Sequence, residues 1–424
     1  MARVSRIAPR PLVPHRLLLA ASCSLLVAAL ARPVAAQTDA PVGAPAEGLS
    51  TTFLGDAREI VVGASVSRDS NLFRFPELPA GTPSETISTA YARFRIDKPY
   101  AQQRFFLEAA VTAYRYERFD YLDFDGVDYR AAWHWTLTPR VTGTLSADRT
   151  QAPTQFQDTV GIRSNVTTNE RYAFNLDGQL FGGWHVLMGV AQTNRTSEQS
   201  LLQGIPDFRE SSGDAGIRYA FASGSDVVAA WRRIEGLQDS QVVNGVVVVS
   251  SANYKEDQSE VRGTWSLSPV SALTGRVTYL DRRYDLSSQN DFYGTAGSVG
   301  YTWVPTGKLR LLLSATRGIS PWQSLSANYR VSNTLSIAPT WEVAARTSIY
   351  LSVGRTYDDF PQQSAAAAVA ERKDTTTNAV LGVNWAATRN LSLNFSVEYH
   401  ERTSTELLLE YATNLARLNA SFGF

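Results

Sequence analysis

Hydrophobic and polar residues alternate along most of the chain from about residue 58 onward. In "VDYRAAWHWTL" (127–137) one set of alternate positions carries Val, Tyr, Ala, Trp, Trp and Leu, and the other set carries Asp, Arg, Ala, His and Thr. "LSLNFSVEYH" (391–400) repeats the scheme near the end of the chain. A period of two predicts β-strands. Long strands with one apolar and one polar face are typical of a sheet that separates lipid from water.

The connections between these stretches also alternate in length. Short turns such as "TPR" (138–140), "SPV" (268–270) and "APT" (338–340) alternate along the chain with polar connections, several of which are long. Short turns at one end and long loops at the other are the mark of an outer-membrane barrel with periplasmic turns. The pattern therefore predicts an all-β fold, a transmembrane antiparallel up-and-down β-barrel of about 18 strands, with 16 as the alternative.

A weak internal repeat leaves another β architecture open. "WTLTPRVTGTL" and "WAATRNLSLNF" each run strand, turn and strand, with a tryptophan near the turn. A β-propeller blade or a β-solenoid coil has a similar period. Blades use shorter strands with short connections at both ends, so the barrel is the better interpretation.

The first 36 residues have the pattern of a secretory signal peptide. Four arginines precede the apolar run "LLLAASCSLLVAALA" (17–31), and "VAAQ" offers a cleavage site after Ala36. The alternative, a transmembrane anchor, would need an apolar run of about 18–20 residues. The predicted organisation is a signal peptide (1–36), a flexible periplasmic segment (37–57) and an outer-membrane barrel (58–424). Cys23 lies in the apolar run, and Ala20 argues against lipidation there.

Composition narrows the class further. Basic and acidic residues balance at 40 each, nearly all the basic ones are arginine, and aromatic residues make up 11%. Removing the arginines of the signal peptide makes the remaining chain mildly acidic, and nothing in it indicates a nucleic-acid partner. No later stretch approaches 18 consecutive apolar residues, which argues against membrane-spanning helices. We expect the protein in the outer membrane of a Gram-negative bacterium.

The two faces of the predicted strands suggest different roles. Six tryptophans beside short turns are expected in the periplasmic aromatic girdle: Trp135, Trp184, Trp265, Trp303, Trp341 and Trp385. The polar face carries more arginines than carboxylates, and its pore-lining candidates are Arg93, Arg95, Arg130, Arg171, Arg262, Arg276, Arg310, Arg330 and Arg346. Such a wall would concentrate anions in the lumen. Alternatively, the arginines pair with carboxylates across strands and brace the wall.

No group of residues with a catalytic or metal-binding pattern stands out. His134, His185 and His400 lie on different predicted strands without metal-ligand spacing. "GASVS" (63–67) lacks the closing glycine and the strand–turn–helix context of a nucleophile elbow. We therefore expect no enzyme and no cofactor or metal. A barrel enzyme that pairs one of these histidines with a serine at the extracellular rim is the distant alternative.

At "GASVSRDSNLFRFPE" (63–77) the sequence resembles the β-barrel porins encoded in exopolysaccharide operons, the EpsL-type group. Members of that group open similarly, with a strand followed by a D-S-N-L-F-R-like stretch, and the positions to carry over are Asp69, Asn71, Leu72 and Arg74. The resemblance implies a part in moving a secreted polysaccharide across the outer membrane. The residues themselves suggest turn formation at the end of the first strand. Direct contact of Asp69, Asn71, Arg74 and the loop around Tyr121 with a glycan is the alternative.

The sequence thus favours an outer-membrane porin-like barrel in exopolysaccharide export, with a general or anion-leaning diffusion porin as the alternative. A barrel enzyme and an adhesin or receptor are weaker hypotheses. The expected partners are outer-membrane lipid, the outer-membrane assembly machinery, exopolysaccharide and other export components. The tail "NLARLNASFGF" (414–424) resembles the closing strand that the assembly machinery reads, and it should pair with the first strand near Ile60–Val66.

Overall fold

The structure is a computed structural model, which describes residues 57–76, 84–153, 156, 165–198, 207–238, 241–243, 246–249, 253–285, 288–321, 329–361 and 371–424. The chain divides into Met1–Thr38 and Asp39–Phe424, and all of the described residues belong to the second unit. The predicted signal peptide and the predicted periplasmic segment through residue 56 lie outside the described residues.

Eighteen strands form one antiparallel sheet. They are β1 (Ala57–Asp69), β2 (Glu85–Tyr100), β3 (Gln103–Tyr116), β4 (Phe124–Thr138), β5 (Val141–Pro153), β6 (Val166–Phe181), β7 (Trp184–Ser197), β8 (Phe208–Ala220), β9 (Asp226–Gln238), β12 (Tyr254–Ser268), β13 (Ser271–Tyr284), β14 (Phe292–Thr306), β15 (Leu309–Pro321), β16 (Tyr329–Ala344), β17 (Thr347–Phe360), β18 (Arg372–Ala386), β19 (Leu391–Ser404) and β20 (Tyr411–Gly423). A separate hairpin of β10 (Gln241–Val243) and β11 (Val246–Val249) lies between β9 and β12, and the sequence did not predict it. Short 3-10 turns occur at η1 (Asp120–Leu122), η2 (Ser288–Asn290) and η3 (Leu407–Leu409).

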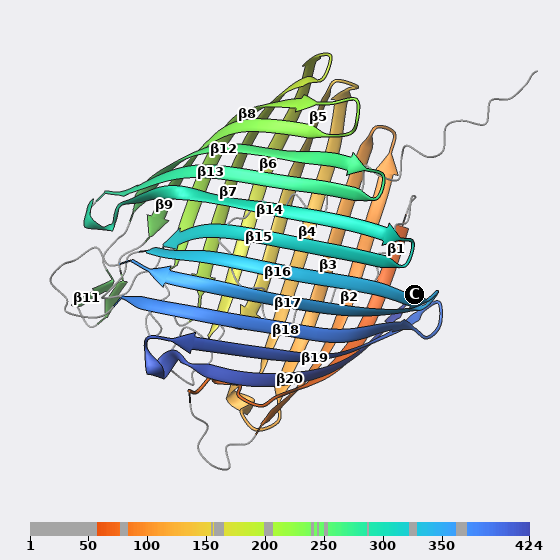
Figure 1. Ribbon diagram of the computed structural model, residues 1–424, viewed down its shortest axis with the longest axis vertical. Helices are drawn as coiled ribbons and strands as arrows, with labels where there is room; N and C mark the ends of the chain where they lie inside the picture. The colour runs from red at the N-terminus through yellow and green to blue at the C-terminus, as the bar shows by residue number, and fades with distance from the viewer. Residues whose placement is uncertain are drawn as a thin grey trace, which may run out of the picture. The chain divides into compact units, whose positions relative to one another are not determined.

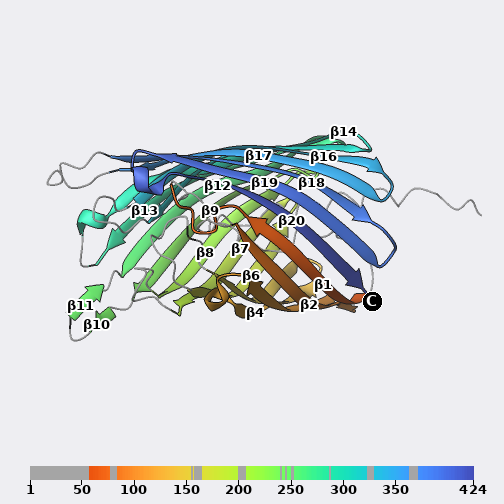
Figure 2. The same cartoon turned by 90° about the horizontal axis from the view of Figure 1, so that it is seen from below.

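The sheet closes on itself, because β1 pairs with both β2 and β20. Figure 2 shows β1 lying beside β20, and Figure 1 shows the strands β12–β20 crossing in front of β1–β7. The seam runs from Val61–Gly423 to Asp69–Leu415, and the Phe424 amide donates to the Ile60 carbonyl at 2.9 Å. The predicted antiparallel barrel of 18 strands is confirmed, as is the pairing of the last strand with Ile60–Val66.

The two ends of the barrel differ in the length of their connections. At one end the strands are joined by short turns of two to five residues, for example Ala101–Gln102 between β2 and β3, and at the other end by longer loops. The predicted turn "APT" (338–340) was wrong, because β16 continues through it and the turn is Ala345–Arg346. Pro339 pairs with Leu311 of β15, whereas its pairing with β17 is interrupted. A proline has no N–H to donate, so it breaks one ladder without ending the strand.

The outward face of the barrel is apolar. Its exposed side chains follow the expected alternation, for example Val261 on β12, Val277 on β13 and Val299 on β14, each more than half exposed. Trp184, Trp265, Trp303, Trp341 and Trp385 are exposed near the short-turn end, while Trp135 stacks on Phe174. Exposed tyrosines, including Tyr279 and Tyr357, lie nearer the long-loop end. An apolar band between two aromatic girdles is the surface that a bilayer requires of a barrel. No helix in the described part of the chain is long and apolar enough to cross a membrane.

Candidate functional site: the inner wall of the barrel

The inner wall carries the side chains that alternate with the apolar outward series. Arg93 lies between the exposed residues Ala92 and Phe94, and Arg276 lies between Gly275 and the exposed Val277. By the same alternation eight of the predicted pore-lining arginines face inward: Arg93, Arg95, Arg130, Arg171, Arg262, Arg276, Arg310 and Arg330. The ninth, Arg346, is a correction: it is exposed in the turn between β16 and β17, because that turn comes later in the chain than predicted.

Carboxylates from adjoining strands neutralise much of this positive charge. Arg130 of β4 contacts Asp148 of β5 at 2.9 Å, and Arg330 of β16 contacts Asp358 of β17 at 3.9 Å. On β12 and β13, Arg262 and Arg276 share Glu260. Three of these contacts, Arg130–Asp148, Arg276–Glu260 and Arg330–Asp358, join residues of adjoining strands, which supports the alternative in which arginines brace the wall. Arg262 and Glu260 both lie on β12.

Several inward carboxylates were missing from the sequence-based assignment of the wall. Asp97 is buried and bound by Arg104 at 2.6 Å. Asp214 lies on β8 four residues before Arg218, so the alternation alone could have found it. Asp358 and Asp374 lie near the long-loop ends of β17 and β18, outside the strands that the alternation predicted there, 341–354 and 375–386. The arginine count therefore overstated the net positive charge of the lumen.

Four of the eight predicted arginines that face inward, Arg93, Arg95, Arg171 and Arg310, form no ion pair with another described residue. The guanidinium of Arg93 lies 6.0 Å from the ring centre of Tyr91, and that of Arg95 lies 5.3 Å from the ring centre of Phe106. Arg171 donates to the Thr193 hydroxyl at 3.2 Å. Their positive charge is available to anions in the lumen, which keeps the anion-leaning interpretation open.

The wall formed by β14–β18 differs in chemistry from the rest. Between its two ends the inward positions are mainly small hydroxyl, amide and glycine residues, namely Ser298, Gly300, Thr302, Ser314, Thr316, Thr334, Ser336, Ser352, Gly354, Thr356, Thr376, Asn378, Gly382 and Asn384. Hydroxyls bond across strands, as in Ser314–Ser336 at 2.6 Å and Thr334–Thr356 at 2.9 Å. Figures 1 and 2 place β14–β18 opposite β2–β7, so a largely neutral wall faces a charged one.

The motif carried over from the family resemblance stabilises the seam. Asp69 is 1% exposed. Its carboxylate accepts hydrogen bonds from the backbone N–H of Asn71 at 2.8 Å, the Arg74 guanidinium at 2.9 Å and the Thr413 hydroxyl at 2.6 Å. The Asn71 side chain donates to the carbonyls of Phe75 and of Ala412, which precedes Thr413 on β20. The motif therefore ties the first loop to the last strand, as the turn-forming interpretation expected.

The loop that contains this motif also contacts two further loops through Phe73. Arg74 has a positive φ of 58°, which is uncommon for a residue other than glycine, and Leu72 next to Phe73 is half-buried. The ring centre of Phe73 lies 4.7 Å from that of Phe119 and 4.9 Å from that of Phe156. Phe119 lies between β3 and β4, and Phe156 follows β5, so aromatic contacts hold three loops together.

A buried charged cluster lies at the long-loop end of β12–β14. Glu256 and Arg282 pair at 2.5 Å, and the guanidinium lies 3.7 Å from the ring centre of Tyr254. Outward Lys255 and Asp257 place this part of β12 above the apolar band. Burial opposes the charged form of Arg282, but the Glu256 carboxylate outweighs it and raises the pKa of Arg282. Burial raises the pKa of Tyr254 above its ordinary value of 10.0.

This burial predicts a loss of stability in alkali. The pKa of Tyr254 is higher in the folded protein than in the unfolded chain. The contribution of the neutral tyrosine to the free energy of unfolding is therefore fully present below about pH 10 and declines as the pH rises further. We expect the free energy of unfolding in urea to fall above that pH, and to fall less steeply in Tyr254→Phe. Tyr293→Phe, at an exposed position, should retain the wild-type slope. Equal slopes in all three proteins would contradict the prediction.

The three histidines are not brought together. His134 is bonded to Thr144, His185 to Asp177 and His400 to Asn378. Among the described residues no serine hydroxyl is bonded to any of them, and no group of His, Cys, Asp and Glu is arranged to hold a metal ion.

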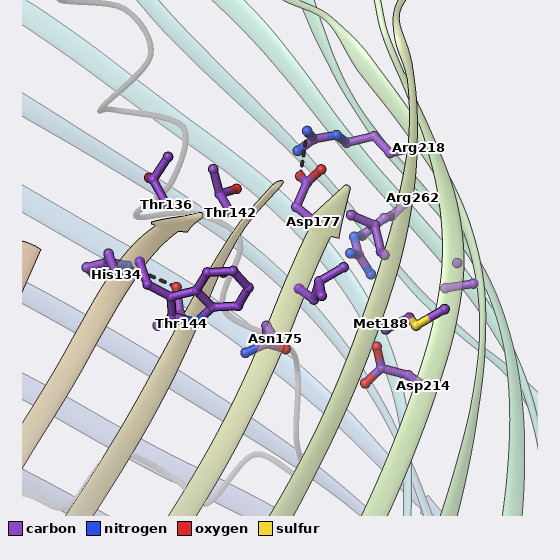
Figure 3. Close-up of a pocket in the computed structure, with 16 residues that line it drawn as sticks. His134, Thr136, Thr142, Thr144, Asn175, Asp177, Met188, Asp214, Arg218 and Arg262 are labelled. Atoms are coloured by element: carbon purple, nitrogen blue, oxygen red, sulfur yellow. Dashed lines mark hydrogen bonds and ion pairs between the residues drawn. The ribbon is translucent and has the colours of Figure 1, made fainter. Parts of the chain in front are cut away.

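A recess of about 500 Å³ lies in the charged wall toward the short-turn end (Figure 3). Strands β4–β9 and β12 line it. Asp177 of β6 is held there by Arg218 of β8 and His185 of β7, both at 2.6 Å. Asn175, Asp214 and Arg262 also face this space. It is the place in the described wall where charged and neutral polar groups converge on a cavity of ligand size.

No protein-family model matches the chain, and no curated protein matches it. Solved structures with a similar arrangement include the outer membrane protein OpdK from Pseudomonas aeruginosa, with 10% identity, a TM-score of 0.47, and coverage of 87% of this chain and 99% of OpdK. They also include the alcaligin outer membrane receptor FauA from Bordetella pertussis, with 12% identity, a TM-score of 0.45, and coverage of 87% of this chain and 76% of FauA. At these values the assignment of the fold rests on the strand pairing of the chain itself.

Proposed function

We propose that this protein is an outer-membrane channel through which a bacterial exopolysaccharide leaves the cell. The observation that carries the proposal is a closed barrel whose lumen is lined by a neutral hydroxyl wall on β14–β18 and a charged wall opposite. Barrels of 16–18 strands are wide enough for an aqueous channel. Hydroxyl and amide groups exchange hydrogen bonds with sugar hydroxyls at little cost when a chain slides past.

The choice of an exopolysaccharide as the transported substrate is supported by the resemblance of "GASVSRDSNLFRFPE" (63–77) to barrels of exopolysaccharide operons. The same proposal places the protein in the outer membrane of a Gram-negative bacterium. Outer-membrane lipid, the assembly machinery and other export components are its partners there. The role assigned to Asp69, Asn71 and Arg74 in this proposal is to hold the mouth of the channel in shape.

A deletion strain tests this function. We expect it to retain little secreted polymer, and the wild-type gene supplied in trans should restore secretion. Polymer that accumulates in the periplasm of the deletion strain would place the defect at the outer membrane. Normal secretion in the deletion strain would overturn the proposal.

A diffusion porin that favours anions is the second candidate. Arg93, Arg95 and Arg171, which form no ion pair with another described residue, favour it. In that case the purified protein should let small sugars and ions pass in liposome swelling at the rate of a general porin, and the deletion strain should secrete normally.

A further inference from the structure

The recess in the charged wall contains one positive charge that no described carboxylate balances. Glu260 is 8% exposed and accepts from Arg276 through Nε at 2.6 Å and through a terminal nitrogen at 2.5 Å. The same carboxylate accepts from Arg262 and, at 3.4 Å, from the Thr278 hydroxyl. A single carboxylate cannot neutralise two guanidinium groups, since arginine stays protonated in proteins.

Exposure decides which arginine presents the excess charge. The Arg276 side chain is 16% exposed and is bonded twice to Glu260, whereas the Arg262 side chain is 37% exposed and lines the recess. Figure 3 shows Arg262 among the labelled side chains around this space. The uncompensated positive charge therefore faces the recess through Arg262.

The other charges around the recess are matched. Asp177 is held by Arg218, and Asp214 lies 3.5 Å from Arg232. The remaining polar lining is neutral and includes Asn175 and the hydroxyls of Thr136, Thr142 and Thr144. The recess thus combines one cation with several groups that exchange hydrogen bonds with hydroxyls.

We propose that this recess binds a uronic acid unit of a sugar chain. The carboxylate pairs with Arg262, and ring hydroxyls bond to Asp214 and Asn175, which lie side by side across Gly189. Thr142, on β5, is within reach of the next unit of the chain. A charge-assisted bond from a guanidinium to a carboxylate is stronger than a bond between neutral groups, so the acidic unit is favoured over a neutral one. This inference rests on the proposed function, which it deepens by naming an acidic polysaccharide as the substrate.

The test uses the full-length protein in planar bilayers, with block of the single-channel current as the readout. Trigalacturonate should block at a concentration at least about tenfold lower than maltotriose does. A factor of about ten in affinity corresponds to the contribution of one hydrogen bond to a charged group. Arg262→Gln should remove this difference, and Arg262→Lys should keep part of it. Arg310→Gln, which removes an inward arginine from the opposite wall, should leave the preference unchanged.

Three results would overturn the inference. Equal block by trigalacturonate and maltotriose would exclude a site that prefers an acidic sugar. Block by inorganic phosphate at the same concentration as trigalacturonate would show that any anion suffices. Equal losses in Arg262→Gln and Arg310→Gln would assign the preference to the general charge of the lumen. Heat-modifiable migration of each variant on gels verifies that it is folded. If the deletion strain secretes normally, the proposed export fails; if it does not secrete but trigalacturonate blocks no better than maltotriose, only the acidic site fails.

Discussion

Asp69→Ala is expected to lower the free energy of unfolding of the barrel by about 3–5 kcal/mol, the cost of leaving a buried charge without its partner. Asp69 is 1% exposed, and the Arg74 side chain bonded to it is 10% exposed. The substitution also removes the acceptor of the Thr413 hydroxyl on β20, so it loosens the seam where the first and last strands meet. Urea titration, read by heat-modifiable migration on gels, measures the effect.

Asp125→Ala is the matched control for this prediction. Asp125 pairs with Arg115 at 2.9 Å, but both side chains are at least half exposed. Exposed ion pairs contribute little because water and salt screen them. If both variants unfold at the same urea concentration, the seam network does not contribute to stability as the structure indicates.

Two neighbouring residues on β14 should respond in opposite ways to the same substitution. Val299 is 53% exposed on the outward face, whereas Ser298 faces the lumen from the neutral wall. Val299→Arg places a charge in the apolar band and is expected to cost about 2–4 kcal/mol of barrel stability. Ser298→Arg should leave the yield of folded barrel near that of the wild type and lower the single-channel conductance, because it adds a large charged side chain to the lumen.

Unfolding titrations in detergent and conductance in planar bilayers compare the pair directly. Each variant is the control for the other, since the substitutions lie one residue apart. A Ser298→Arg protein that fails to fold while Val299→Arg folds normally would reverse the assignment of the two faces.

The arginines of the wall show how far the sequence could lead. Alternation placed Arg93, Arg130 and Arg276 on the correct face, because side chains of a strand point to opposite sides in turn. It misplaced Arg346, since Pro339 looked like a turn residue and in fact lies within β16. A proline in the sequence indicates that hydrogen bonding to a neighbouring strand is interrupted. Only the observed pairing shows that β16 is interrupted toward β17 but continues past Pro339 along β15.

The ion pairs were beyond the sequence for a different reason. Asp177 and Arg218 lie on strands separated by β7, and Asp69 and Thr413 lie near opposite ends of the chain. Their contacts depend on the stagger of each strand against the next. That stagger is fixed by the bonds of the closed sheet and cannot be obtained from the pattern of a single strand.

The sequence by itself determined the fold class and the face of most residues and favoured about 18 strands over 16, because a period of two and the alternation of short and long connections are local properties. The tertiary structure alone decided which charges of the wall are paired, that the recess keeps an unbalanced positive charge at Arg262, and that the family-like motif stabilises the seam. Those properties arise when strands distant in sequence are brought side by side, and the Coulomb energy of a pair depends on the distance that this packing sets.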